Sequence, residues 1–483
     1  MISISININQ IPGLSELERE KFRKLLDIYS AHLTQNHEKN RYYEGKVSLN
    51  EVNLGIALPE GMRKLEIGCA WGAKTVDVLA GLSMFDGFVG VNGDPSPEIN
   101  DIVVKNRMVS EYMKACRDEL KFGCTFATLS KDRVSGCRIR FHSPQTAAAS
   151  WDGEKGRIDC GFAIIATDDD VLSNESFPTL INFYLDDTVL VFHRRDRTDF
   201  WKTERFVNRM GRPLMEPLIW NATSKKPFGR SRIKEPIRRL IQGYVRTIAN
   251  ATIGLEFSTA PQKYLLGVTD EQYEALINEK FRQYVGSIIA TTHNPETQDK
   301  PTFGQLAQGN ISPHVEMIRV LATQFSAATG LTVTDTGVVN DANPTSSDAI
   351  LAQSRTLTGM AEQLNAGNGD SLREIALMAM AVKNDVSLDE LTDEQKDIVA
   401  HFKNPAMPSV SVTADAAIKI ATVREGFSET DVFLEMIGFD QADVRRIKAQ
   451  ESKARGQQAL DLEFGDADQS EDVETVQEPA GSD

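Results

Sequence analysis

The sequence predicts an α+β fold, in which an antiparallel β region is followed by a series of long helices. Between residues 122 and 207, short alternating runs such as RIRFHS and TVLVFHRR are separated by Gly, Pro, Asn and Asp. Three helical segments with recognisable end signals then follow. Strands and helices do not alternate along the chain, as they would in a doubly wound parallel sheet.

The first elements are a helix and a glycine turn. Apolar residues recur at helical spacing between 14 and 46, for example at Phe22, Leu25 and Leu33. The stretch LEIGCAWGAKT, residues 65–75, is typical of a strand that runs through a glycine turn into a helix. Such turns either hold a nucleotide or let two backbones pack closely.

Three helices follow the β region. The first opens near Pro236 and runs to about Phe257. The second has Ser312 as its N-cap, Pro313 at its first position and Gly330 just beyond its end. The third starts at a capping box at 345–348, is broken by Gly367 and Gly369, and resumes over 370–382.

The remaining segments connect or follow these helices. Residues 258–309 contain a short amphipathic helix at about 270–285, and LTVTDTGVVNDANP, residues 331–344, precedes the third helix. Apolar spacing predicts further helices over 414–423 and 431–447.

Composition describes an ordinary globular chain with an acidic end. The 483 residues are 41% apolar and 25% charged, and no apolar run is long enough to span a membrane. Five cysteines without a CxxC pair indicate reduced, buried thiols. Residues 456–483 hold nine acids and no base, more than half of the formal charge of −16, and are expected to be disordered. This negative net charge argues against a protein that binds nucleic acid tightly through its phosphates. It does not exclude a protein that lets nucleic acid slide past it.

The glycine turn permits one enzymatic alternative, an S-adenosylmethionine-dependent methyltransferase. Residues 64–99 resemble the nucleotide-binding half of such enzymes, with Glu66, Gly68 and Gly72 at matching positions. Ala70 replaces the middle glycine and Asn92 replaces the ribose-binding acid, and a neutral amide cannot accept from both ribose hydroxyls as a carboxylate does. The competing interpretation is a buried turn in which Trp71 and Val78 pack.

No other catalytic pattern occurs. The seven histidines are scattered without HxxxH or HxE spacing, and GxSxG is absent. The acidic run 168–170 is interpreted as a loop between strands rather than a metal site. The sequence therefore predicts no catalytic residue, no metal and no cofactor.

Several motifs together resemble the portal proteins of tailed bacteriophages, in the subgroup common in long-tailed phages of Gram-positive hosts. The N-terminal signature of the family is matched by NRYYEGK at 40–46 and by the run from 54 to 88. The entry to the family's first stem helix resembles KPFGRSRIKEPIRRL at 226–240, and the entry to its clip resembles PQKYLLG at 261–267. NPTSSDAI at 343–350 and NPAMPSVSVTADAAIKIA at 404–421 resemble later family motifs. The matches in the glycine turn are Trp71, Lys74, Val76, Asp77, Leu79 and Ala80. Under this resemblance the turn is a packing turn and not a cofactor loop.

The resemblance implies a portal fold with wing, stem, clip and crown, assembled as a ring of about twelve copies around a central channel. Mapped onto this chain, the expected regions are a wing at 1–232, stem helices at 233–257 and 311–330, a clip at 258–310, a tunnel loop at 331–345, a kinked long helix and return to the wing at 346–410, a crown at 411–460 and an acidic disordered tail at 461–483.

Two groups of residues are then candidates for contact with DNA or with a neighbouring subunit. The tunnel loop is polar or acidic and lacks Lys and Arg, which suits DNA passage because a basic loop would pair with phosphates. Its candidate channel residues are Thr332, Thr334, Asp335, Thr336, Asn340, Asp341 and Asn343. The basic segment 225–246 gives Arg230, Arg232, Arg238 and Arg239 as candidates for DNA or subunit contact.

The resemblance also implies partners and a place in the virion. Double-stranded DNA would pass through the channel, the clip would dock the terminase large subunit and later a head–tail adaptor, and the major capsid and scaffolding proteins would surround the ring. The protein would be assembled in the host cytoplasm at one capsid vertex, with no membrane involved. It would not be an enzyme, because ATP hydrolysis would belong to the packaging motor.

Overall fold

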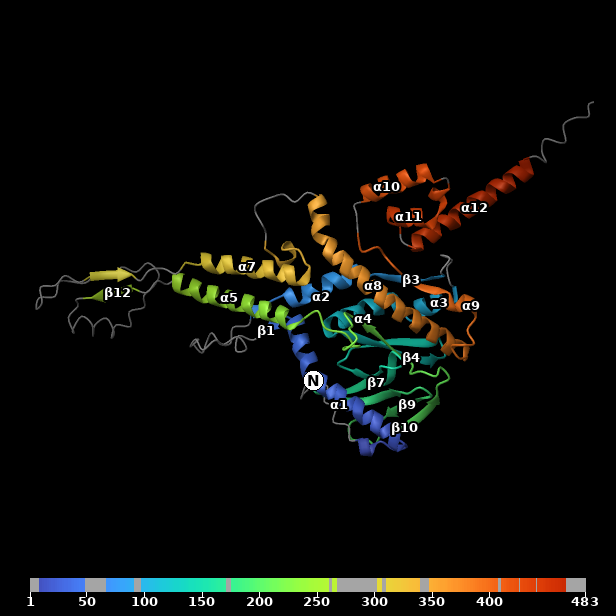
Figure 1. Cartoon of the computed structure of the whole chain (residues 1–483), viewed down its shortest axis with the longest axis horizontal. Helices are drawn as coiled ribbons and strands as arrows, with labels where there is room; N and C mark the ends of the chain where they lie inside the picture. Colours follow the sequence, from blue (N-terminus) through green and yellow to red (C-terminus); the bar gives the residue numbers. More distant parts are fainter. Residues whose placement is uncertain are drawn as a thin grey trace, which may run out of the picture. The chain divides into compact units, whose positions relative to one another are not determined.

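A computed structural model of the chain describes residues 8–47, 67–90, 97–170, 175–259, 263–266, 302–305, 310–338, 347–406, 410–424, 426–439 and 441–465. The chain forms two compact units, Met1–Phe402 and Lys403–Asp483. In the first unit helices and strands are mixed, and every strand pair among the described residues is antiparallel (Figure 1). The methyltransferase alternative requires a parallel, doubly wound sheet, which the described strands do not form.

A five-stranded sheet and the first helix enclose one hydrophobic core. The sheet has the order β10-β9-β8-β7-β6. Its strands are β6 (Ala147–Asp152), β7 (Arg157–Asp170), β8 (Glu175–Tyr184), β9 (Thr188–His193) and β10 (Lys202–Val207). Helix α1 (Glu16–Tyr43) begins at a capping box of Ser15 and Glu18 and places Phe22 against Phe162, Phe183 and Phe192 of the sheet. These buried rings fix the helix on the sheet.

A three-stranded sheet with helices forms the second and larger core of this unit. Its order is β11-β4-β5, with β4 (Cys124–Asp132), β5 (Gly136–His142) and β11 (Met215–Ile219). Helices α4 (Met108–Phe122) and α8 (Ser347–Asn384) pack against these strands, and α3 (Pro97–Lys105) packs against α4 and α8. Strand β3 (Phe85–Gly90) pairs with β14 (Ile398–Phe402). Strand β14 was not predicted, because its partner lies about 300 residues earlier in the chain.

The glycine turn is a packing turn. Strand β2 (Ile67–Gly68) pairs with β1 (Lys46–Val47), and helix α2 (Trp71–Leu82) follows. A Cβ on Gly72 would overlap with the carbonyl oxygen of Tyr42, so glycine lets α2 approach the end of α1. The strand–turn–helix prediction is confirmed for residues 67–75, whereas Glu66 and Asn92 lie outside the described residues.

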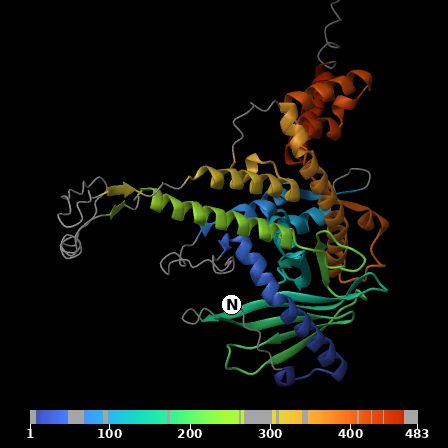
Figure 2. The ribbon, with the colours of Figure 1, turned by 60° about the vertical axis from the view of Figure 1, so that its left-hand side comes forward.

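Two long helices run side by side (Figure 2). They are α5 (Glu235–Thr259) and α7 (Ser312–Thr329), and β12 (Lys263–Leu266) pairs with β13 (Thr302–Gln305) between them in the sequence. Gly330 ends α7 in the left-handed region, as predicted. The predicted N-cap is wrong by one position: Ile311 is the N-cap residue, and Asn310 Oδ1 accepts from the Ser312 amide at 2.9 Å. The helix predicted at 270–285 lies outside the described residues.

Helix α8 (Ser347–Asn384) is continuous through Gly367 and Gly369, so the predicted break there is wrong. Between them Asn368 is fully buried and donates to Glu119 Oε2 at 2.8 Å and to Tyr112 OH at 2.9 Å. Each glycine in a helix interior costs roughly 1 kcal/mol relative to alanine. The stabilisation from packing of this turn outweighs that cost.

The second unit is helical. It contains α10 (Val410–Val423), η4 (Phe427–Glu429), α11 (Asp431–Ile437) and α12 (Gln441–Gly465). The single helix predicted at 431–447 is two helices, because Gly438 adopts the left-handed region and ends α11. The acidic end was expected to be disordered from residue 456, but α12 continues to Gly465, and only 466–483 lie outside the described residues.

Candidate functional site

Trp71 joins the paired helices to the body of the first unit. Its ring lies 4.4 Å from that of Tyr244 on α5 and 4.6 Å from that of Phe325 on α7. Its indole Nε1 donates to the carbonyl oxygen of Thr336 at 3.1 Å. One buried side chain at the start of α2 therefore contacts both helices and the turn that follows them.

The turn after α7 contains four of the seven predicted channel residues. Asp335 accepts from the Thr332 amide and from Thr332 Oγ1, both at 2.8 Å, and Thr332 Oγ1 lies 2.7 Å from Thr334 Oγ1. Thr336 Oγ1 donates to the carbonyl of Val333. The residues Thr334–Thr336 form η3, and Gly337 follows in the left-handed region. Many of the polar side chains that suggested a loop facing DNA therefore form hydrogen bonds within the turn itself.

The other three candidates, Asn340, Asp341 and Asn343, lie outside the described residues. The described part of the loop, 331–338, contains no Lys or Arg, in agreement with its sequence. Whether these seven residues line a channel stays a prediction.

Arg232 was a candidate for contact with DNA or with a neighbouring subunit, but the structure places it in the interior. Its side chain is 6% exposed, with Nε donating to the Thr75 carbonyl at 2.7 Å and Nη2 to the Thr329 carbonyl at 2.8 Å. Burial lowers the pKa of this guanidinium to about 10. Because its donors bind α2 and the carboxyl end of α7, Arg232 holds the base of the helix pair and is not available to a second molecule.

The other three candidate arginines differ from one another. Arg238 pairs with Glu38 and with Glu235, the latter at 2.6 Å, and Arg239 pairs with Glu235 at 2.8 Å. Their acidic partners therefore come from the same chain, whereas the sequence also allowed a neighbouring subunit. Arg230 is exposed and has no ion pair among the described residues.

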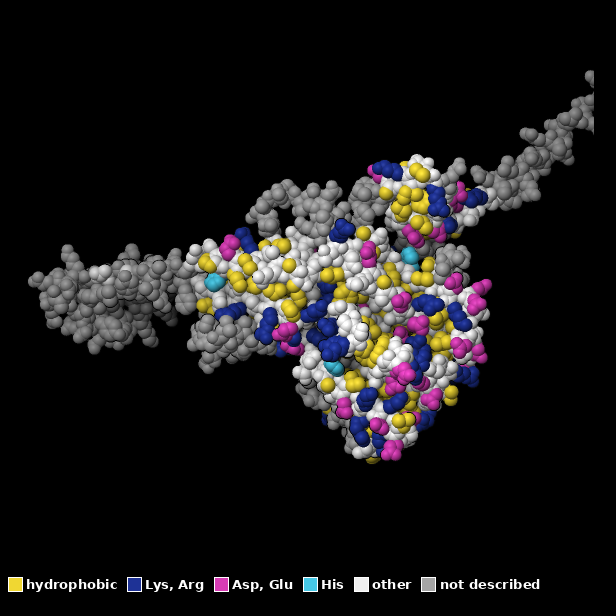
Figure 3. Space-filling model, viewed as in Figure 1, with side chains coloured by type: hydrophobic (Ala, Val, Ile, Leu, Met, Phe, Trp, Pro, Cys, Tyr) yellow, Lys and Arg dark blue, Asp and Glu magenta, His cyan; other side chains and the backbone are white. Residues whose placement is uncertain are grey.

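Apolar side chains remain exposed on the helix pair. The exposed fractions are 47% for Met317 and 48% for Val320 on α7, and 45% for Leu255 on α5. On the inward side of α7, Leu321, Ala322 and Phe325 are buried, whereas Val315 is 44% exposed. Figure 3 shows hydrophobic side chains over α5 and α7 on the face in view. A helix pair with an exposed apolar face presents a surface for another protein.

A buried polar cluster connects α4, α8 and the end of α2. Glu119 is fully buried, Asn368 donates to it, and Ser83 Oγ lies 2.7 Å from Tyr112 OH and 2.6 Å from Asn365 Oδ1. Burial raises the pKa of Glu119 to about 8. Sequence reasoning missed this cluster, although an asparagine between two glycines inside a helical pattern could have drawn attention to it.

Among the residues that the structure describes, no group of three or more metal-ligating side chains occurs. The acidic run 168–170 ends strand β7 and is not in the expected loop. The five cysteines are free and buried, and burial raises the thiol pKa of Cys69 to about 11. None of the described helices combines the length and apolar character that a bilayer span requires.

Comparison with known families gives the class of this chain. A family model described as "Phage portal protein, SPP1 Gp6-like" matches residues 23–457. The chain is therefore a phage portal protein, a structural component of a phage-like particle, and its place is the portal vertex. More narrowly, it belongs to the SPP1 Gp6-like family, which confirms the resemblance found in its motifs.

The solved structures that it resembles are distant. The neck of a native GTA particle computed with C12 symmetry aligns with a TM-score of 0.44 and 12% identity over 76% of this chain and 89% of that chain. The neck of an empty GTA particle computed with C6 symmetry gives 0.45 and 12% over 81% and 98%. A virion of a native gene transfer agent gives 0.44 and 11% over 76% and 89%. The search of curated proteins returned no significant match.

Proposed function

We propose that copies of this chain form a closed ring of about twelve subunits around a channel through which double-stranded DNA is packaged and later ejected. In this proposal the wing comprises 1–232, the stem helices comprise 233–257 and 311–330 and contain most of α5 and α7, and the clip comprises 258–310. The tunnel loop comprises 331–345, the kinked long helix and return to the wing 346–410, the crown 411–460 and the acidic tail 461–483.

The main support for a ring is the exposed apolar face of the helix pair. Met317 and Val320 lie one turn apart on α7 and are each about half exposed. In a ring of parallel copies, this face of α7 would pack against a neighbouring stem and be removed from water. The rigid attachment of the pair through Trp71 and Arg232 supports a stem held at a fixed angle to the wing.

The proposed partners follow from this arrangement. The clip would dock the terminase large subunit during packaging and then a head–tail adaptor, and the wing and crown would face the major capsid and scaffolding proteins. The ring would be assembled in the host cytoplasm. The chain itself would be non-enzymatic, and the terminase would hydrolyse ATP.

Electron microscopy combined with native mass measurement tests the ring. We expect the purified chain to form closed rings with an open central channel, and the double variant Met317→Glu with Val320→Glu to remain monomeric and folded, because buried unpaired carboxylates are costly. The control Met317→Leu with Val320→Ile keeps both positions apolar and should assemble. Rings of normal stability from the glutamate variant would show that this face of α7 is not a subunit interface.

A further inference from the structure

A cavity lies between α1, the strands β4 and β6, and the segment that leads into α5. It has a volume of about 730 Å³ and is open to solvent. Its inner wall is apolar, with Phe126 and Phe228 in edge-to-face contact and Ala147, Ala148 and Ala149 beside them. This volume and lining are those of a ligand-binding pocket, roughly 300–1,000 Å³ in proteins generally. No part of the proposed ring or channel uses it.

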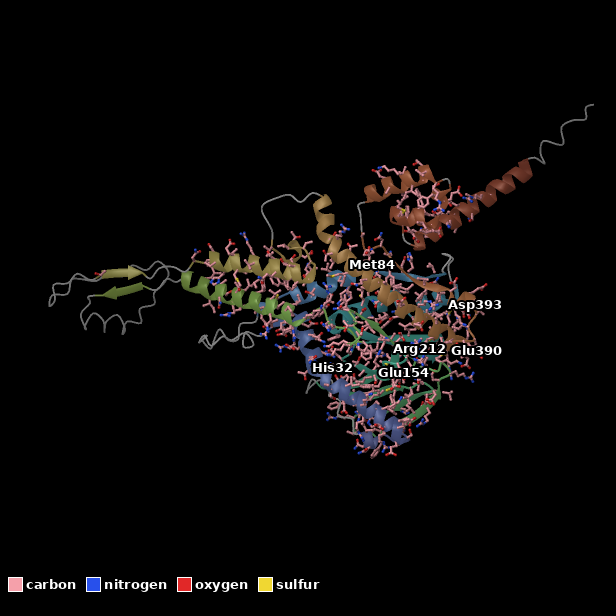
Figure 4. The ribbon with its side chains drawn as sticks, viewed as in Figure 1. His32, Met84, Glu154, Arg212, Glu390 and Asp393 are labelled. Atoms are coloured by element: carbon pink, nitrogen blue, oxygen red, sulfur yellow. The ribbon has the colours of Figure 1, made fainter. Side chains whose placement is uncertain are left out.

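The rim of this cavity is strongly basic. Lys39, Lys226, Arg230 and Lys234 line it and have no carboxylate partner within ion-pair distance among the described residues. Arg238 also lines it, but Glu38 and Glu235 already neutralise that side chain. Figure 3 shows Lys and Arg side chains gathered where α1 approaches the start of α5, in the area in which Figure 4 labels His32.

Lys39 and Lys226 both contribute positive charge to this cavity. Lys39 is half-buried and, within the described part of the chain, donates to the Phe122 carbonyl at 3.1 Å and to Asn36 Oδ1 at 3.4 Å. Burial, together with the charges of Lys39 and Lys226, lowers the pKa of His32. An uncompensated set of cations around an apolar cavity favours an anionic ligand with an apolar part.

The backbone of the rim disfavours a phosphate group as that anion. The amides of Gly229, Arg230 and Arg232 donate to the carbonyls of Lys226, Trp220 and Leu120. These residues therefore offer no free backbone N–H groups of the kind that bind phosphate in most phosphate loops. Positive charge comes from side chains spread along α1 and the 226–234 segment, an arrangement that suits several carboxylates along an extended chain. A DNA duplex is too wide to enter a cavity of this volume.

We propose that this cavity binds an acidic peptide segment of a partner protein, with an aliphatic or aromatic side chain inserted against Phe126 and Phe228 and its carboxylates on Lys39, Lys226, Arg230 and Lys234. Charge complementarity carries this assignment, because the rim has an excess of cations and the wall has apolar surface to cover. The proposal does not depend on the ring or on the channel.

Fluorescence anisotropy with the full-length chain tests the proposal with two labelled peptides. One is a designed peptide of glutamate alternating with leucine and phenylalanine, which stands for a partner segment. The other has the sequence of residues 459–479 of this chain, which contains Leu and Phe among its acids and no base, and it tests whether a second copy is the occupant instead. We expect saturable binding of the designed peptide in the micromolar range, weakening as salt is raised. The double variant Lys226→Glu with Lys234→Glu should weaken binding about tenfold or more.

Matched variants separate the cavity from general charge. Lys225→Glu changes the same charge one residue away, outside the cavity lining, and should alter affinity by less than about twofold. Lys226→Arg with Lys234→Arg should retain binding. The proposal is overturned if the designed peptide does not saturate, or if the glutamate variant binds it as tightly as the parent chain does. It is also overturned if the 459–479 peptide, pyrophosphate or a short DNA duplex binds more tightly than the designed peptide with the same dependence on Lys226 and Lys234.

Discussion

At the scale of single residues, Gly72 shows why the turn before α2 requires a glycine. The carbonyl oxygen of Tyr42 occupies the place where any Cβ would go, so a side chain here must push α2 away from the end of α1. We expect Gly72→Ala to lower the free energy of unfolding by about 1–3 kcal/mol, measured by urea denaturation.

Gly81 on the same helix is the matched control for this prediction. Its Cβ position has no atom within 4 Å, so Gly81→Ala should raise stability by about 0.5–1 kcal/mol through its higher helix propensity. Equal effects of the two substitutions would show that the close approach at Gly72 does not stabilise the turn.

Glu119 should make the stability of the first unit depend on pH. Burial raises its pKa from 4.5 to about 8 in the folded chain, so between these pH values the folded state holds a proton that the unfolded state has lost. Stability from this group is therefore fully present below about pH 4.5 and falls as the pH rises to about 8. Glu119→Gln, which remains neutral, should remove this part of the decline.

Unfolding of both proteins in urea between about pH 5 and about pH 8 measures this effect. Glu111→Gln removes an exposed carboxylate from the same helix and should leave the pH dependence of the parent chain unchanged. A parent stability that is constant over this interval would mean that Glu119 is not protonated in the folded chain.

At the scale of elements, the described residues after α7 form a hydrogen-bonded turn, and the proposed tunnel loop continues beyond it. The Asp335 carboxylate accepts two hydrogen bonds from Thr332, so its replacement would disturb the turn itself. Asp341 offers a cleaner test of the proposed tunnel loop. We expect Asp341→Lys to reduce DNA packaging in an assay with capsids and terminase, because the added cation would pair with passing phosphates.

Asp341→Asn removes the negative charge without adding a positive one and should package DNA close to the parent level. Ring formation, checked by native mass, should be the same for both variants. Normal packaging by Asp341→Lys in intact rings would contradict the placement of this loop in the channel.

At the scale of the whole molecule, the acidic tail is expected to contribute little to assembly. Residues 466–483 contain seven acids and no base, and a polar segment of this kind buries too little apolar surface to stabilise an interface. A chain that ends at Gly465 should form rings of the same size and thermal stability as the full chain, measured by native mass and thermal denaturation. Loss of rings on truncation would assign the tail a structural role.

The fold class, the helix pair and the portal family could all be predicted from the amino-acid sequence. Periodicity and terminal residues locate α1, α5 and α7, and ordered motifs over most of the chain specify the family, because these signals are local or collinear with the sequence.

Features that depend on residues far apart in the chain could not be predicted in this way. Strand β14 exists because β3 pairs with it, α8 continues through two glycines because Asn368 binds Glu119, and Arg232 is buried because α2 and α7 meet around it. The basic cavity likewise needs α1, two strands and the segment before α5 together. Long-range packing and burial set these features, and neither propensity nor residue spacing along the chain records them.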